Sequence, residues 1–276
     1  MPVSRTVPVG VRLRDVPSGG VAELARAASA LDASGTGFVV FGTQVGGLDP
    51  STVASFLARR TSGLGLVVEA APQRDHPYNI ARRVASLDHL TRGRAGWWVL
   101  SDDDSTELGL GVRSSWVDAP RSTRNPDAVT AVRALWRTWP AAAVVGDVES
   151  NIFTRAEDIR YADHRGVFAT AGPLTVPTTP QGEPVIFGPG TSDIAVEGDT
   201  AFASVSVDAI GSALDAGASG VVVDVHDLDA WLHDVLPGLI QDGVVRPRRS
   251  TTTLRGYLNI GLPAEPDLSA NRPVYT

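Results

Sequence analysis

Short apolar runs alternate with helical patterns along this chain of 276 residues. The runs bear the residues of buried strands, and the longer segments between them place apolar residues at helical spacing. The strands are expected at 7–13, 37–41, 64–70, 94–101, 184–188, 200–207 and 220–225, and the helices at 21–33, 49–60, 77–90, 126–139, 207–216 and 228–240. Strands separated by helices indicate a parallel α/β sheet with right-handed crossovers. Seven strands fit a barrel that lacks one element, or a doubly wound sheet.

Two stretches depart from this alternation. Residues 140–183 hold short apolar pieces between turn residues, which indicates an ordered excursion from a βα unit and not a second domain. From Pro247 onward the chain is polar, which predicts an extended C-terminal tail over 247–276. We therefore expect a single domain over 1–276.

Composition removes several classes of function. The chain is 43% hydrophobic and 20% charged, which suits a large buried core. Its net charge of −7 argues against a surface for nucleic-acid phosphates, and the absence of cysteine excludes disulfides, thiolate nucleophiles and Cys-ligated metals. No stretch approaches the ~20 apolar residues of a membrane span. We expect a soluble, cytoplasmic protein.

Four segments carry a family resemblance. The strongest is HPYNIARRVASLDHLTRGRAGWWVLS at 76–101, followed by ALWRTW at 134–139, by DHRG through GPL to PQGEPVI at 163–186, and by 235–262. Together they resemble the bacterial luciferase-like flavin-dependent monooxygenases, in the branch of the nitrilotriacetate, dibenzothiophene-sulfone and long-chain alkane enzymes. The resemblance implies a TIM-barrel-like (β/α)8 fold. At least one βα unit is shortened or missing, because the chain passes from 204 to 220 without the family's seventh strand.

The resemblance also implies a cofactor site. Members of this family bind reduced FMN at the C-terminal ends of the barrel strands, where such barrels place their sites. Carried over by position, Trp98 and Ser101 would lie near the flavin ring, and Gly190, Thr191 and Ser192 would hold its phosphate. Glu69 and His76 are the candidates for catalysis. Several family hydroxyls are replaced, since Glu69, Ala71 and Pro72 stand at the end of the third strand, and Ser122 stands where relatives have a tyrosine.

Residues 188–192, which the resemblance places at the phosphate of the cofactor, offer a weaker phosphate site than the family's loop does. A phosphate dianion needs free backbone N–H groups backed by a helix N-terminus. Pro189 removes one N–H group, and the segment after Ser192 is too short for the expected helix. Asp193, Glu197 and Asp199 would repel a phosphate, unless Asp193 turns away as a cap.

Other interpretations compete at the barrel mouth. Glu69, the run 102–104 of aspartates, Asp224, His226 and Asp227 could bind a divalent metal, or could be a solvated loop with Asp227 as a helix cap. Trp97 and Trp98 must point to opposite faces of their strand. The inward one is either a stacking platform or a plug that fills the interior.

Three functional hypotheses follow. The first is a trimmed monooxygenase that takes reduced FMN from a separate flavin reductase and oxidises a small organic substrate with oxygen. The second is a catalytically inactive relative that serves as a binding or interaction subunit. The third is a metal-dependent hydrolase that uses the acidic mouth. Apolar surface uncovered by the missing segment also predicts a homo-oligomer.

Overall fold

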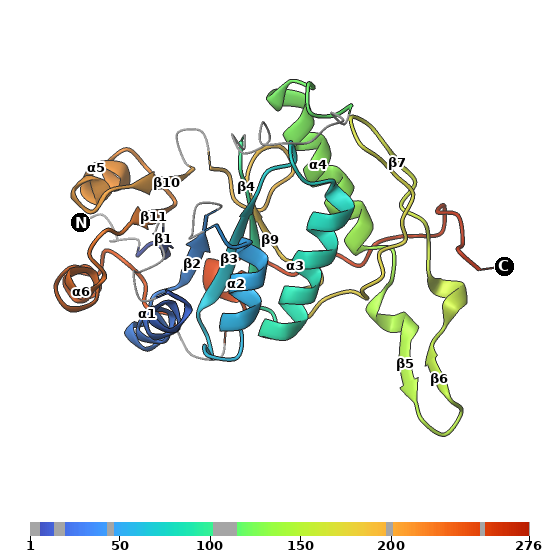
Figure 1. The fold of residues 1–276 in the computed structure, drawn as a ribbon, viewed down its shortest axis with the longest axis horizontal. Coiled ribbons are helices and arrows are strands. Elements are labelled where there is room, and N and C mark those ends of the chain that lie inside the picture. Colours follow the sequence, from blue (N-terminus) through green and yellow to red (C-terminus); the bar gives the residue numbers. More distant parts are fainter. Residues whose placement is uncertain are drawn as a thin grey trace.

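One parallel sheet of seven strands forms the centre of the molecule (Figure 1). The computed structural model describes residues 6–13, 20–42, 47–101, 115–196, 201–248 and 252–275. The sheet order is β10-β11-β1-β2-β3-β4-β9. Its strands are β1 Val9–Leu13, β2 Phe38–Phe41, β3 Gly65–Ala70, β4 Ala95–Val99, β9 Val185–Phe187, β10 Phe202–Val205 and β11 Gly220–Asp224. Each of the seven predicted strands is therefore confirmed, and all of them belong to this sheet.

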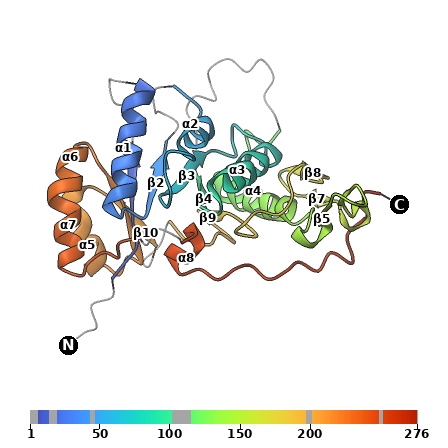
Figure 2. The same ribbon diagram turned by 90° about the horizontal axis from the view of Figure 1, so that it is seen from below.

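Helices cover the outer face of the sheet (Figures 1 and 2). They are α1 Gly20–Ser34, α2 Pro50–Leu57, α3 Pro77–Thr91, α4 Arg121–Trp136, the turn η4 Val207–Ala209 with α5 Ile210–Asp215, and a continuous run of α6 Leu228–Ala230, η5 Trp231–Val235 and α7 Leu236–Gln241. Helix α4 begins before the predicted start at Pro126, because tertiary contacts stabilise its first turn. The side chains of Arg124 and Asn125 both donate to the carbonyl oxygen of Ser101.

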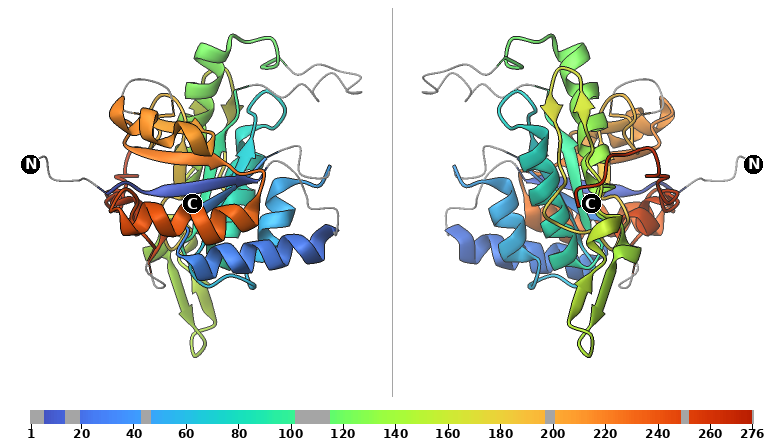
Figure 3. Two further views of the ribbon diagram at one scale, coloured as in Figure 1. Left: turned by 90° about the vertical axis from the view of Figure 1, so that its left-hand side faces the viewer. Right: turned by 90° about the vertical axis from the view of Figure 1, so that its right-hand side faces the viewer.

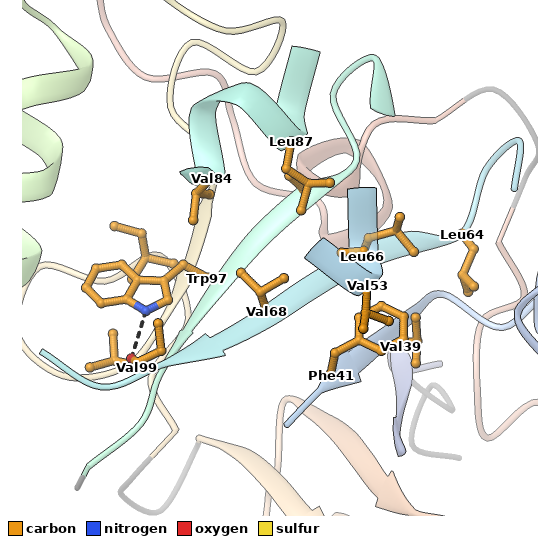
Figure 4. Packing of buried hydrophobic residues seen from close by; sticks show 14 of the residues in the cluster. Val39, Phe41, Val53, Leu64, Leu66, Val68, Val84, Leu87, Trp97 and Val99 are labelled. Carbon is orange, nitrogen blue, oxygen red and sulfur yellow. Dashed lines mark hydrogen bonds between the residues drawn. The ribbon is translucent and has the colours of Figure 1, made fainter. Parts of the chain in front are cut away.

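Alternate side chains of each strand face these helices, as the period of a strand requires. Figure 4 shows Val68 and Trp97 pointing from the sheet toward the helix layer, where Val53 and Val84 lie. Trp97 is fully buried, and its Nε1 donates to the carbonyl oxygen of Ala70 over 3.1 Å. Most of the buried apolar surface lies in this outer layer.

The inner face encloses a second, aromatic cluster. Phe38, Phe187 and Phe202 meet at centroid distances of 5.3 to 6.2 Å, and Trp98 lies against Phe187. Glycines on the inner positions of neighbouring strands make room for the rings. A Cβ atom at Gly10 would lie 2.3 Å from the ring of Phe38, closer than real contacts allow. The barrel interior is thus packed and is not a pore.

A short helix closes the bottom of the barrel. Helix α8 Leu254–Leu258 inserts Leu254, Tyr257 and Leu258 into the inner cluster. The Tyr257 hydroxyl accepts from the backbone N–H of Val9 over 2.9 Å and donates to the carbonyl oxygen of Arg246. The prediction of an extended tail over 247–276 is therefore wrong for these residues, since a five-residue helix is too short to show a periodic pattern.

The two edge strands of the sheet approach one another through an intervening segment. The N–H of Gly188, after β9, donates to the carbonyl oxygen of Ile194, and the N–H of Phe202 in β10 donates to that of Ala195. Each bond is 2.9 Å long. On its other side β10 pairs directly with β11. Residues 194 and 195 therefore bridge the two edges of a curled, seven-stranded sheet, which corresponds to a trimmed barrel.

The excursion after α4 forms small antiparallel hairpins. These are β5 Val144–Asp147 with β6 Ile152–Thr154, and β7 His164–Arg165 with β8 Ala169–Thr170, beside the turns η2 Ala141–Ala143 and η3 Ala156–Asp158. The division into one domain stays a prediction. Within the described ranges, no helix combines the length and apolar character needed to cross a membrane.

Candidate functional site

The C-terminal ends of the strands gather charged side chains at the centre of the barrel mouth. Arg12 of β1, Glu69 of β3 and Asp224 of β11 occupy inward positions of their strands. The Nε atom of Arg12 lies 2.9 Å from Oε1 of Glu69, and its Nη1 lies 3.8 Å from Oδ1 of Asp224 and donates to the hydroxyl of Ser204. The guanidinium group therefore balances two carboxylates over the aromatic interior.

Trp98 lies directly beneath this arginine. The guanidinium carbon of Arg12 is 4.6 Å from the centre of the indole, which is a cation–π distance. The ring of Phe187 stacks on the indole, with centroids 5.4 Å apart and an angle of 15° between planes. The side chain of Trp98 is only 7% exposed, so it is covered by this chain's own residues. The geometry is that of an interior plug and not of an open stacking platform.

Arg12 did not emerge from the sequence as a site residue. The signal was present, because strand VGVRL puts valine and leucine on outward positions and leaves Gly10 and Arg12 on inward ones. A single arginine at an inward position of a buried parallel strand requires a buried partner. Glu69 is that partner. It is itself buried, at 9% exposure.

His76 acts as a helix cap. Its Nδ1 accepts from the N–H of Tyr78 at the start of α3, over 3.2 Å. The rings of Trp116 and Phe168 meet the imidazole edge to face at 5.3 and 5.7 Å. Burial lowers the pKa of His76 below its ordinary 6.5, although a backbone hydrogen bond with Ala169 works in the opposite direction. The lowered pKa and the acceptor role of Nδ1 both favour the neutral imidazole.

The predicted phosphate loop follows β9 and leads into no helix over the described residues up to 196. The hydroxyl of Ser192 donates to the carbonyl oxygen of Pro189 over 2.7 Å, within the loop itself. Gly190 and Thr191 are exposed, and Gly190 has a φ of +68°. Arg133 of α4 donates to the carbonyl oxygen of Thr191, and its charge beside the loop is balanced by ion pairs with Glu183 and Asp193.

Asp193 does turn away from the loop. Its Oδ2 accepts from the N–H of Ile186 and pairs with Arg133, and its Oδ1 pairs with Arg255 at 2.9 Å. Arg255 is 2% exposed and also donates to the carbonyl oxygen of Glu183. This carboxylate is therefore neutralised inside the molecule, and it does not repel an anion at the loop.

These observations fit FMN only at its phosphate end. The amides of Gly190 and Thr191, with Arg133 nearby, offer donors to a phosphate. The ring end does not fit the described residues, because Trp98 is buried in contact with Arg12 and Phe187, and Arg12 is held there by its ion pair with Glu69. Ser101, the other residue expected near the ring, contributes its carbonyl oxygen to bonds with Arg124 and Asn125.

The described residues do not support the interpretation of the barrel mouth as a metal site. Among them, no group of three or more histidine and acidic side chains is arranged to hold an ion. Asp227 is the predicted N-cap, because its Oδ1 accepts from the N–H of Ala230 over 3.0 Å. The aspartates at 102–104 lie outside the described residues.

The family model that matches this chain agrees with the resemblance found in its sequence. The model of the family "Luciferase-like monooxygenase" matches residues 1–200. N-acetyl-S-(2-succino)cysteine monooxygenase of Bacillus subtilis is 38% identical over 146 residues, which are 52% of this chain and 33% of that protein. The chain thus spans about a third of the length of that relative.

The chain is also similar to two subunits of one enzyme and to a solved structure. One of the subunits of pristinamycin IIA synthase from Streptomyces pristinaespiralis is 31% identical over 189 residues, 66% of this chain and 63% of that subunit, and another subunit of the same synthase also matches. The crystal structure of DmoA from Hyphomicrobium sulfonivorans superposes with a TM-score of 0.74 at 15% identity, covering 99% of this chain and 97% of that one. This last similarity concerns the fold alone.

Proposed function

Because this chain belongs to the luciferase-like monooxygenase family, we propose that it is the non-catalytic subunit of a two-chain, flavin-dependent monooxygenase. The predicted family and the trimmed TIM-barrel-like fold are both confirmed. In the proposed assembly a longer luciferase-like chain holds reduced FMN, which a separate flavin reductase supplies. That longer chain oxidises a small organic substrate.

The covered indole of Trp98 carries this proposal. A flavin ring at the barrel mouth needs a flat, accessible surface, and here the indole is 7% exposed, in contact with Arg12 and Phe187. Opening it would require breaking the Arg12–Glu69 ion pair, in which both partners are about nine-tenths buried. Leaving a buried charge without its partner is strongly unfavourable.

The relatives support a subunit role. Two of the matched proteins are, by name, different subunits of one enzyme, pristinamycin IIA synthase, and this chain is 31% identical to each over the matched residues. Two homologous chains therefore serve one enzyme in that case. We infer the same division here, between this chain and a longer member of its family.

A second candidate is that this chain itself binds reduced FMN. The exposed amides of Gly190 and Thr191 beside Arg133 favour it, because they would suit a phosphate. Ser192, Ser101 and Trp98 would then belong to the same site, and Glu69 and His76 would be its nearest acid–base groups. This candidate requires the Arg12 side chain to leave the mouth when the cofactor binds.

Flavin stoichiometry separates the two candidates. Each longer luciferase-like chain of the source organism would be mixed with this chain, and the mixture separated by size before its FMN content is measured. We expect one of them to form a complex with one flavin per pair of chains, and faster substrate oxidation than the longer chain alone. Two flavins per pair, or no complex with any longer chain, would contradict the subunit proposal.

A further inference from the structure

The β5–β6 hairpin projects away from the body of the molecule (Figures 1 and 3). Its apolar side chains are exposed: Val145 at 43%, Val148 at 86%, Ile152 at 46% and Phe153 at 63%. A two-stranded ribbon is marginally stable by itself in water. Apolar residues gathered on such a ribbon are typical of a surface that another molecule covers.

The base of the hairpin is held firmly. The indole Nε1 of Trp139 donates to the hydroxyl of Thr154 over 3.1 Å, and that hydroxyl donates to the carbonyl oxygen of Ala143 over 2.8 Å. The ring of Phe153 meets Trp139 edge to face. The hairpin is therefore presented in a fixed direction, as a docking element needs to be.

The tip combines apolar and negative character. Val148 is flanked by Asp147 and Glu149, and all three side chains are exposed. Asp147 also shapes the turn, because its carboxylate accepts from the N–H of Glu149 and from the hydroxyl of Ser150. Glu149 and Val148 are thus the tip residues that can be changed without removing a turn contact of their side chains.

A pocket whose charge is opposite to that of the tip lies at the C-terminal end of α3. It is formed by the ends of α2 and α3 and by the residues before α8, and it has a volume of about 490 Å³. Its lining contains three arginines and no acidic residue: Ala58, Arg59, Thr61, Ser62, Leu90, Thr91, Arg92, Arg94, Thr252 and Thr253. Arg59 and Arg92 are exposed, and Leu90 is 54% exposed.

The arginines of this pocket differ in their availability. Arg94 is buried and donates to the carbonyl oxygens of Ala58, Thr61, Leu64 and Thr91, so it serves the fold. Within the described part of the chain, Arg59 and Arg92 have no carboxylate within ion-pair distance. The pocket therefore presents Arg59 and Arg92 around Leu90, as the tip presents Asp147 and Glu149 around Val148.

We propose that the β5–β6 hairpin is an exchange arm, whose tip docks in the Arg59–Leu90–Arg92 pocket of a second copy of this chain. Both features lie at the end of the barrel where the strands begin, because α3 and α4 run antiparallel to the strands and the hairpin follows α4 (Figure 1). Two copies that meet through these ends can therefore exchange arms reciprocally, which gives a closed two-fold dimer. Opposite charges fix the register of the contact, and the apolar residues exclude water from it.

Sedimentation velocity of the purified chain tests this inference without flavin or any partner. We expect a dimer whose dissociation constant rises about tenfold or more with Glu149→Arg, with Arg92→Glu or with Val148→Ser. Combining Glu149→Arg with Arg92→Glu in one chain restores the opposite charges and should recover most of the affinity. Glu265→Arg is the control, because it makes the same charge change at an exposed position outside the arm.

Three outcomes would overturn the inference. A monomer at high micromolar concentration excludes a second copy as the occupant, and arm variants that then weaken binding only to a longer family member assign the arm to that chain. A dimer indifferent to Glu149→Arg and Val148→Ser places the interface elsewhere. Loss of association in the double-charge variant, with an unchanged circular dichroism spectrum, refutes the pairing of Glu149 with Arg92.

Discussion

The guanidinium group of Arg12 lies 4.6 Å above the indole of Trp98 and pairs with the carboxylate of Glu69 at 2.9 Å. These contacts join β1, β3 and β4 at the mouth of the barrel. They place a buried ion pair where the family resemblance implies a flavin ring. The barrel thus keeps its relatives' scaffold while its centre is filled from within.

Replacing Arg12 should destabilise the fold more than a surface change does. Arg12→Met removes the cation that pairs with the buried carboxylate of Glu69, and such a change costs about 3 kcal/mol of unfolding free energy. Urea denaturation measures the loss. Adding Glu69→Gln to Arg12→Met removes the buried negative charge as well and should recover at least half of it. Full stability of Arg12→Met would show that the ion pair is absent in solution.

The aromatic interior predicts a contrast between two glycines. Gly10→Ala places a methyl group against the ring of Phe38, and overpacking of this kind costs about 1–3 kcal/mol. At Gly211 in α5 an added methyl group would have nothing within 4 Å, so Gly211→Ala should stabilise by up to about 1 kcal/mol. Thermal unfolding should therefore move in opposite directions for these variants. Equal shifts would argue against the packed interior.

Helix α8, which closes the bottom of the barrel, depends on the hydroxyl of Tyr257. Burial raises the pKa of Tyr257 to about 12, so the hydroxyl stays protonated and donates to Arg246. Tyr257→Phe leaves the buried N–H of Val9 without its acceptor, at a cost of about 1–3 kcal/mol. Tyr275→Phe, at a position 58% exposed, is the matched control and should change the unfolding free energy little. Equal effects would mean that α8 does not plug the barrel.

Stability should decline as the pH drops through the range where His76 titrates. The pKa of His76 is lowered in the folded state, so the unfolded chain takes up a proton first as the pH falls below 6.5. The contribution of His76 is thus complete above that pH and is lost as the pH falls through the folded value. Asparagine caps helices without titrating, so His76→Asn should flatten this part of the profile. His233→Asn, at an exposed position, is the control and should leave the pH profile of stability as it is. An unchanged profile in His76→Asn would contradict the role given to His76.

Hydrophobic periodicity was sufficient to predict the sheet and the long helices. Strands such as FVVF at 38–41 are apolar on both faces, and α3 begins at Pro77, where the helical pattern predicts its start. The cap at His76 was not predicted, because histidine is not a usual N-cap residue. Helix α8 was not predicted, because its five residues are stabilised by the burial of Leu254 and Tyr257 and not by local helix preference.

The candidate site was less predictable, because it depends on contacts between distant strands. The sequence allowed Trp98 to be either a platform or a plug. The choice is made by Arg12 and Phe187, which lie 86 and 89 positions away along the chain. In the same way, Asp193 is neutralised by Arg133 and Arg255, which no spacing rule connects to it.

The most direct test of the account is an anaerobic titration of the isolated chain with reduced FMN, followed by absorbance, together with fluorescence quenching of oxidised FMN. A longer family member that carries flavin serves as the positive control. We expect no saturable change with the isolated chain up to high micromolar flavin, because Arg12 and Phe187 cover the indole of Trp98. Stoichiometric binding at low micromolar flavin would contradict it, and would show that this barrel holds the cofactor itself.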